Sequence, residues 1–182
     1  MIIGLTGKAG SGKGTVADYL VSKYHAVKLR FSAVLDDILR RLFLDVSREN
    51  EINLAMALRE KFGPDVLARA LLFDLKEKKL KLGVLDGIRY REEYEVFKQE
   101  PDFFLVYLDT PFELRYQRNL KRGEKKDDKV SFERFKEMEL SPTEIYIEKF
   151  KTEADYIIDN SGSLDVLYQK IDHVLGPKII KG

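Results

Sequence analysis

A glycine-rich segment near the start of the chain constrains its fold more than any other feature. Residues 7–15 read Gly-Lys-Ala-Gly-Ser-Gly-Lys-Gly-Thr and directly follow the apolar run 1–5. The phosphate-loop template asks for Gly, four residues, Gly, Lys and then Ser or Thr. Gly7, Gly12 and Lys13 match this template. The pattern therefore predicts a buried strand, a tight phosphate-binding loop and a helix, in that order.

Each residue type in this loop has a physical role in holding phosphate. Glycines let the backbone curl until successive N–H groups point at one anion, and the helix that opens at Lys13 adds partial positive charge. Lys13 can reach the β- and γ-phosphates, and we expect it to face solvent and ligand. Gly14 stands where the template has a hydroxyl, so Thr15 is the candidate hydroxyl ligand of the metal. The predicted phosphate-binding set is Gly7, Lys8, Ala9, Gly10, Ser11, Gly12, Lys13, Gly14 and Thr15.

Composition narrows the class of protein. The length of 182 residues fits one domain, and a hydrophobic content of 44% suffices for a core. Since 32 basic residues balance 31 acidic ones, the net charge of +1 argues against a dedicated nucleic-acid or membrane-surface binder. The chain has no cysteine, which excludes disulfides and thiolate zinc sites. No apolar run approaches the ~18 residues of a membrane span, so we expect a cytoplasmic protein.

Short apolar strands alternate with helical segments along the chain. Strands are expected at 1–6, 26–31, 82–87, 103–108 and 156–159. Helices are expected at 13–23, at 32–43 with Ser32 as N-cap, and at 50–62, 64–75, 91–99, 111–121 and 163–175. This order predicts an α/β fold, a three-layer α/β/α phosphate-loop domain with a five-stranded parallel sheet.

The predicted organisation is a single domain, 1–182. Its core comprises 1–31, 82–121 and 141–182. The helical segment 32–80 is longer than a minimal crossover needs, and we assign it to acceptor binding. Residues 122–140 are assigned to a short lid, whose Gly- and charge-rich part 122–130 reads as a flexible loop.

Ligands of parallel α/β sheets bind beyond the carboxyl ends of the strands. That edge gathers the phosphate loop with residues 86–89, 109–111 and 160–162. Asp86 is the candidate partner of Mg²⁺, which needs only one or two carboxylates besides waters and phosphate oxygens. Arg89 can form a forked contact with phosphate. The alternatives are a turn aspartate at 86 and a surface ion pair of Arg89 with Glu92 or Glu93.

Three arginines share one face of a predicted helix. Arg115, Arg118 and Arg122 are spaced by three and four residues, and Arg122 borders the charged loop. Such a basic-edged loop could close over a transferring phosphoryl group and exclude water. A solvated helix face with acidic neighbours is an equally good explanation of the spacing.

The acceptor site is the least readable part of the sequence. Arg30, Arg40, Arg41, Arg59 and Arg69 lie in or beside the acceptor segment, and one or two of them could bind an acceptor phosphate. For any single one, a solvated helix charge is the better interpretation. His25 and His173 are interpreted as structural or surface residues.

The motifs resemble those of P-loop nucleotide kinases across nearly the whole chain. The Lys-Gly-Thr string at 13–15 is similar to that of adenylate kinases, as is the run Asp-Thr-Pro-Phe-Glu-Leu at 109–114 that leads to Arg118 and Arg122. In that family the first such arginine packs beside the ATP base and the second contacts the phosphates at the lid. The resemblance implies these roles for Arg118 and Arg122.

Two further segments resemble neighbouring branches of the same family. The tail 154–164 is similar to that of dephospho-CoA kinases, and in these folds the loop after the last strand borders adenine, which implies a nucleotide contact at Ser161 and Gly162. The string Asp-Gly-Ile-Arg at 86–89 looks most like small archaeal nucleotide-kinase-like proteins, and it is also similar to phage-type deoxynucleoside monophosphate kinases. Residues 44–80 match no acceptor motif of these families.

The leading interpretation is a kinase that uses ATP and Mg²⁺ to phosphorylate a small nucleotide-like acceptor, most simply a nucleoside or deoxynucleoside monophosphate. Its predicted catalytic residues are Lys13, Arg89, Arg118 and Arg122. The alternative enzyme is a dephospho-CoA kinase. An ATPase or GTPase switch is a second alternative, although the Asp-x-x-Gly string at 159–162 falls too late in the chain and no Asn-Lys-x-Asp string occurs. A binding module with an inactive site is a third, and Lys13 argues against it.

Overall fold

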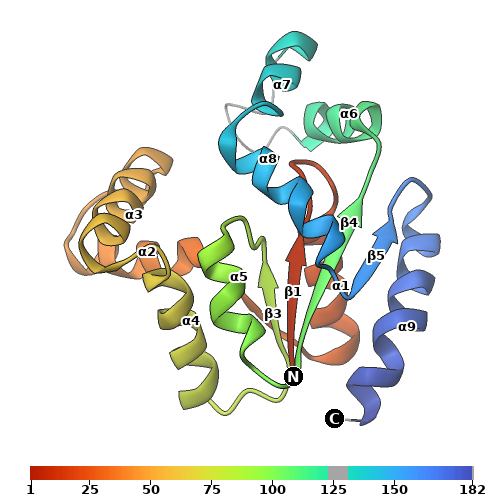
Figure 1. Ribbon diagram of the computed structural model, residues 1–182, viewed down its shortest axis with the longest axis horizontal. Coiled ribbons are helices and arrows are strands. Elements are labelled where there is room, and N and C mark those ends of the chain that lie inside the picture. Colours follow the sequence, from red (N-terminus) through yellow and green to blue (C-terminus); the bar gives the residue numbers. More distant parts are fainter. Residues whose placement is uncertain (123–130, 182) are drawn as a thin grey trace.

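The computed structural model describes residues 1–122 and 131–181. Five strands form one parallel sheet in the order β2-β3-β1-β4-β5, so the predicted α/β fold with a five-stranded parallel sheet is confirmed (Figure 1). The strands are β1 (Ile2–Thr6), β2 (Val27–Leu29), β3 (Gly83–Asp86), β4 (Phe103–Asp109) and β5 (Tyr156–Asp159). The carboxyl end of β1 lies at the same edge as those of β3 and β4, because Leu5 pairs with Asp86 and Thr6 with Tyr107.

Helices cover both faces of the sheet, as the alternation of side chains along β1 requires. Ile3 and Leu5 point to one face and pack in a core with α1 (Lys13–Tyr24) and α9 (Leu164–Lys181). Ile2 points to the other face, where the core is built with α4 (Val66–Glu77), α5 (Arg91–Lys98) and α8 (Pro142–Lys149). The two termini lie together at the end of the sheet opposite the phosphate loop (Figure 1).

The segment assigned to acceptor binding folds as a helical group beside β2 and β3. It contains α2 (Phe31–Arg41) and α3 (Arg48–Phe62), which pack with α4 through a small cluster of Leu35, Ala55 and Leu67. Ser47 caps α3, since its side chain accepts a hydrogen bond from the N–H of Asn50. Figure 1 shows this group projecting to one side of the sheet.

A second helical group lies over the carboxyl edge of the sheet (Figure 1). It consists of α6 (Phe112–Arg122), α7 (Phe132–Met138) and α8, followed by the short 3-10 helix η2 (Phe150–Thr152). Phe112 and Tyr116 of α6 pack edge-on against Phe132 of α7, which joins the two helices. The charged loop predicted at 122–130 falls almost wholly outside the described residues.

Several predicted boundaries differ from the structure. The second strand ends at Leu29, and α2 begins at Phe31 with Arg30 rather than Ser32 in the capping position, because the Phe31 ring packs against both neighbouring apolar clusters. Helix α9 continues through Pro177 to Lys181 instead of ending near residue 175, and Ile179 packs against the core there. Helices α7 and α8 were not predicted. In the described part of the chain, no helix combines the length and apolar character that crossing a bilayer would need.

Candidate nucleotide-binding site

The loop between β1 and α1 has a conformation that requires glycine. Gly7, Gly10 and Gly12 have φ values of +138°, +77° and +97°, a region that side chains disfavour. A Cβ at residue 10 would lie 2.7 Å from the carbonyl oxygen of Arg115, and one at residue 12 would lie 2.4 Å from Asn160 Nδ2. The predicted curled loop is therefore present and leaves no room for larger residues at these two positions.

Buried hydrogen bonds from neighbouring strands hold the loop in place. The carbonyl oxygen of Ser11 accepts from Thr110 Oγ1 at 3.1 Å and from Asn160 Nδ2 at 2.9 Å. Thr110 and Asn160 directly follow β4 and β5, and both are buried. Sequence reasoning placed both segments at this edge but did not identify the Asn160 side chain as a support of the loop, because a single asparagine after a strand has no distinctive signal.

Lys13 lies folded over the loop, whereas the sequence led us to expect it to face solvent and ligand. Its Nζ donates to the carbonyl oxygens of Gly7 and Lys8, at 2.6 and 3.0 Å. Burial lowers the pKa of Lys13 to about 7, and the nearby Arg89 guanidinium acts in the same direction, while Asp86 opposes it.

Asp86 ends β3 beside the loop, as predicted, and its carboxylate has a partner that the sequence did not indicate. Lys28 of the neighbouring strand β2 lies 3.2 Å from Asp86 Oδ2 and also pairs with Asp18 of α1. Thr15, the other predicted metal residue, lies half-buried in the first turn of α1.

Among the described residues, no three His, Cys, Asp or Glu side chains come together as a metal site. One carboxylate beside a phosphate loop nonetheless fits Mg²⁺, which keeps several waters and binds phosphate oxygens directly. Asp86, with Thr15, would hold the ion through such waters.

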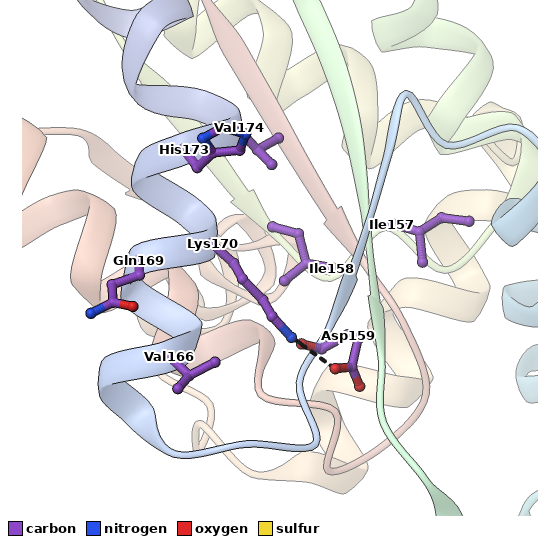
Figure 2. A pocket seen from close by; sticks show the side chains of 8 residues that line it. All are labelled: Ile157, Ile158, Asp159, Val166, Gln169, Lys170, His173 and Val174. Carbon is purple, nitrogen blue, oxygen red and sulfur yellow. Dashed lines mark hydrogen bonds and ion pairs between the residues drawn. The ribbon is translucent and has the colours of Figure 1, made fainter.

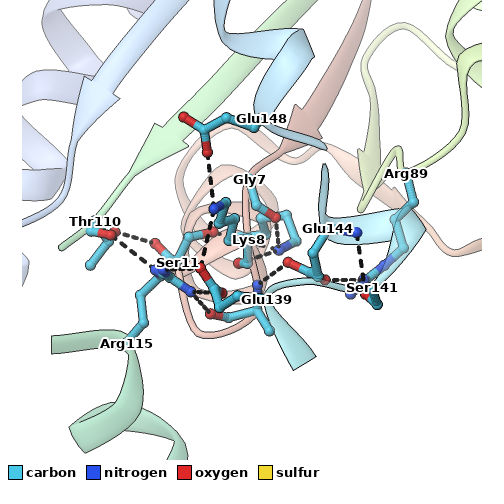
Figure 3. A network of polar contacts seen from close by, with 12 residues as sticks. Gly7, Lys8, Ser11, Arg89, Thr110, Arg115, Glu139, Ser141, Glu144 and Glu148 are labelled. Atoms are coloured by element: carbon cyan, nitrogen blue, oxygen red, sulfur yellow. Dashed lines mark hydrogen bonds and ion pairs between the residues drawn. The ribbon is translucent and has the colours of Figure 1, made fainter. Parts of the chain in front are cut away.

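Arg89 is held at the edge of the loop by two glutamates. Its Nη1 lies 3.1 Å from Glu144 Oε1 (Figure 3). Its backbone N–H donates to Glu93 Oε2 at 3.1 Å. The ion pair of the guanidinium is therefore with Glu144 of α8, not with Glu92 or Glu93. The second oxygen of Glu144 accepts from the N–H of Ala9 at 3.3 Å, so this carboxylate lies directly against the phosphate loop.

A second set of ion pairs fastens the segment after α7 to the loop. Arg115 is buried and donates from Nη1 and Nη2 to the carboxylate of Glu139, at 2.6 and 2.9 Å, and from Nη1 to the Ala9 carbonyl at 3.2 Å (Figure 3). Lys8 pairs with Glu139 and with Glu148. Burial alone would raise the pKa of Glu139, but its hydrogen bonds from Arg115 and Lys8 hold that pKa below the ordinary value. Of the three arginines on α6, Arg115 thus supports the phosphate loop, because it binds the Ala9 carbonyl and Glu139 at once.

The predicted base-binding residues gather where β5 ends. Arg118 Nη2 donates to the carbonyl oxygen of Asn160 at 2.9 Å, while its Nη1 is buried and finds no hydrogen-bond partner in the described part of the chain. Ser161 and Gly162 follow and are exposed. Arg122 is the last residue of α6, and its side chain falls outside the described residues.

A separate groove of about 510 Å³ lies between β5 and α9 (Figure 2). Its walls include Ile158, Val166 and Val174, and Lys170 crosses it to pair with Asp159 at 2.7 Å. No residue of the phosphate loop lines it. The groove is thus distinct from the site on the carboxyl edge.

A protein-family model described as an AAA domain matches residues 3–141, which include the loop, Asp86, Arg89 and Arg115. The chain belongs to this AAA domain family. The chain is also similar to a UPF0200 protein of Sulfurisphaera tokodaii, with 30% identity over 176 residues that are 96% of this chain and 95% of that protein.

Solved structures show the same fold for this AAA domain. TT1252 from Thermus thermophilus superimposes with a TM-score of 0.65 at 24% identity and covers 97% of both chains. A shikimate kinase from Bacteroides thetaiotaomicron gives a TM-score of 0.65 at 16% identity over 97% of this chain and 98% of its own. The AAA domain described here is a small P-loop protein with a kinase-like fold, as the resemblance implied.

Proposed function

We propose that the protein is a kinase that transfers the terminal phosphoryl group of ATP to a nucleotide-like acceptor, most simply a nucleoside or deoxynucleoside monophosphate. The proposal rests on the residues that meet at one edge of the sheet. The glycine loop and Lys13 lie there beside Asp86 and Arg89, which come from the end of β3. Arg118 lies there too, because it binds the Asn160 carbonyl at the end of β5. A binding module would need the loop, but not an arginine between the loop and an added helical region.

The phosphate loop and the residues after β5 form the part of the site that would bind ATP, the phosphoryl donor. The N–H groups of residues 7–15 cradle the phosphates, and Lys13 neutralises them once it leaves the loop carbonyls. Arg118, Ser161 and Gly162 border the base. When bound, Mg²⁺ supplies neutralisation of the β- and γ-oxygens, and Asp86 and Thr15 are the residues that would hold it.

The acceptor end lies toward the helical region 32–80. Arg59 of α3 stacks over the Tyr90 ring at 4.4 Å and lies 3.1 Å from Glu93 Oε1. Because Glu93 also binds the N–H groups of Arg89 and Tyr90, this contact ties the helical region to the residue that we assign to the transferring group. Of the five arginines considered from the sequence, Arg59 is the one with this placement.

The reaction needs positioning and charge neutralisation rather than a covalent intermediate. An acceptor oxygen forms a bond to the γ-phosphorus as the bond from that phosphorus to the β,γ-bridging oxygen breaks, and ADP leaves with the electron pair. Arg89 contacts the phosphoryl group during its transfer. Residues 122–140 act as a lid that excludes water, with Arg122 at its border.

Dephospho-CoA kinase is the second candidate. It is favoured by residues 154–164, which include β5 and the start of α9 and are similar in sequence to the tail of dephospho-CoA kinases. Its acceptor is a hydroxyl group, whereas a nucleoside monophosphate presents a phosphate dianion. The two candidates therefore differ in whether the oxygen that accepts the phosphoryl group belongs to a phosphate or to a hydroxyl.

A panel of acceptors tests the proposal. Radiolabelled ATP and Mg²⁺ are supplied with each nucleoside monophosphate, each deoxynucleoside monophosphate and dephospho-CoA, and GTP replaces ATP in a parallel series. We expect transfer to at least one acceptor, its loss in Lys13→Ala and its retention in Lys23→Ala, a lysine on the same helix that pairs with Asp172 away from the loop. Hydrolysis without transfer to any acceptor would favour the switch instead.

A further inference from the structure

The protein holds one of its own carboxylates against the phosphate loop. Glu144 lies in the first turn of α8 and is buried, with 7% of its surface exposed. One of its oxygens accepts from the Ala9 N–H and the other pairs with Arg89 (Figure 3). A backbone N–H of the loop and an arginine at its border are the donors that this kind of site offers to phosphate oxygens.

The position of Glu144 identifies one end of the phosphate chain. The β5 side of the sheet carries the predicted base contacts, and the start of α1 holds the inner phosphates. Arg89 follows β3, on the opposite side of β1 from β5. A carboxylate that bridges Ala9 and Arg89 therefore lies at the end where the terminal phosphoryl group leaves toward the acceptor.

We infer that the Ala9 N–H and the Arg89 guanidinium form the subsite of the terminal phosphoryl group, and that Glu144 occupies this subsite until ATP displaces it. The inference rests on the proposed binding of ATP by the loop. Glu144 and a phosphoryl group cannot both accept from the single Ala9 N–H, and two anions held side by side at Arg89 repel each other. ATP must therefore release the start of α8 from the loop, whereas ADP, which ends at the β-phosphate, leaves Glu144 in place.

The residues just before Glu144 explain how its carboxylate returns to the loop after ATP has left. Glu139 remains clamped to Arg115 and Lys8, and Ser141, which caps α8 through the Glu144 N–H at 3.4 Å, lies between the clamp and Glu144. A short tether keeps the local concentration of the displaced carboxylate high. The free site is thus protected from inorganic anions, and the affinity for ATP is reduced by the fraction of molecules in which Glu144 is bound.

Calorimetric titration of ATP and of ADP into Glu144→Gln tests the inference. The amide keeps the shape of the side chain but removes its charge. We expect ATP to bind about ten- to a hundredfold more tightly than to the unaltered protein, since a charge-assisted contact no longer competes, and ADP affinity to change less than threefold. Glu137→Gln removes the same charge from α7, where Glu137 pairs with the exposed Arg134, and should alter neither affinity.

Hydrogen exchange on the unaltered protein gives a second measurement that needs no variant to fold. Saturating ATP should speed exchange of the backbone N–H groups of residues 143–149, and saturating ADP should not. Equal ATP affinity in Glu144→Gln and the unaltered protein, or slower exchange of this segment with ATP, overturns the inference while leaving ATP binding intact. If neither protein bound ATP, the proposed function itself would fail.

Discussion

ATP affinity should depend on pH through Lys13, because this lysine is unusually acidic in the free protein. Its pKa is lowered to about 7 by burial and by the guanidinium of Arg89. Bound phosphate oxygens favour the ammonium form and raise the pKa again. Above pH 7, the free protein must take up a proton to bind ATP, whereas below pH 7 it is already protonated.

The magnitude follows from the fraction of neutral lysine. With a pKa of about 7, half of the molecules are neutral at pH 7 and about 99% at pH 9, so the apparent dissociation constant for ATP should rise about fiftyfold between these pH values. The phosphate oxygens of ATP contribute little here, because phosphate monoesters already ionise near pH 6.

Calorimetry in buffers of different ionisation enthalpy measures both quantities. At pH 9 we expect uptake of about one proton per ATP bound. Lys13→Arg is the matched control, since an arginine stays charged throughout this range, and its ATP affinity should be almost independent of pH. An affinity of the unaltered protein that stays constant from pH 7 to pH 9 would refute the low pKa of Lys13 and the assignment of Lys13 to the phosphates.

Three further predictions concern other residues that we assign to the site. Asp86→Asn should lower the rate of transfer on the order of a hundredfold and raise the Mg²⁺ concentration needed for half activity. Asp18→Asn is the control, because Asp18 and Asp86 are both partners of Lys28, and it should leave the Mg²⁺ titration unchanged. Asn160→Ala should reduce the free energy of unfolding by about 1–3 kcal/mol in a urea titration, because the buried carbonyl of Ser11 loses a donor; an unchanged midpoint would contradict this role. Arg122→Ala should lower kcat by roughly 10³ with a smaller change in ATP affinity, and equal losses in both would mark a ground-state contact instead.

Local patterns sufficed for the parts of the fold that depend on neighbouring residues. The loop at 7–15 could be recognised because glycine spacing and the flanking strand and helix are all written within a few residues. The strands were found as short apolar segments between helical ones, and the near-continuous apolar run at 103–108 is typical of a strand that is covered on both faces. Asp86 and Arg89 were placed at the edge because parallel strands end there together.

Helix boundaries that depend on tertiary packing could not be predicted as well from the sequence. Phe31 was assigned to a strand, and it begins α2 because its ring fits between two apolar clusters. In the segment 131–149, apolar residues alternate irregularly with charged ones, and the helices α7 and α8 were missed. Phe135 and Ile147, both buried, anchor these helices, but two such residues in a charged stretch give weak periodicity.

The amino-acid sequence by itself determined that a strand, a glycine loop and a helix would form a phosphate cradle at one edge of a parallel sheet. Only the tertiary structure decided which side chains meet at that cradle. Glu144 lies 135 residues from Ala9 and 55 from Arg89, and on its own helix it is one acidic residue among several. Charges are read from sequence as solvated, because water is their default partner. Docking of α8 on the sheet removes that water, and the same glutamate becomes a buried anion in the site that we propose for phosphate.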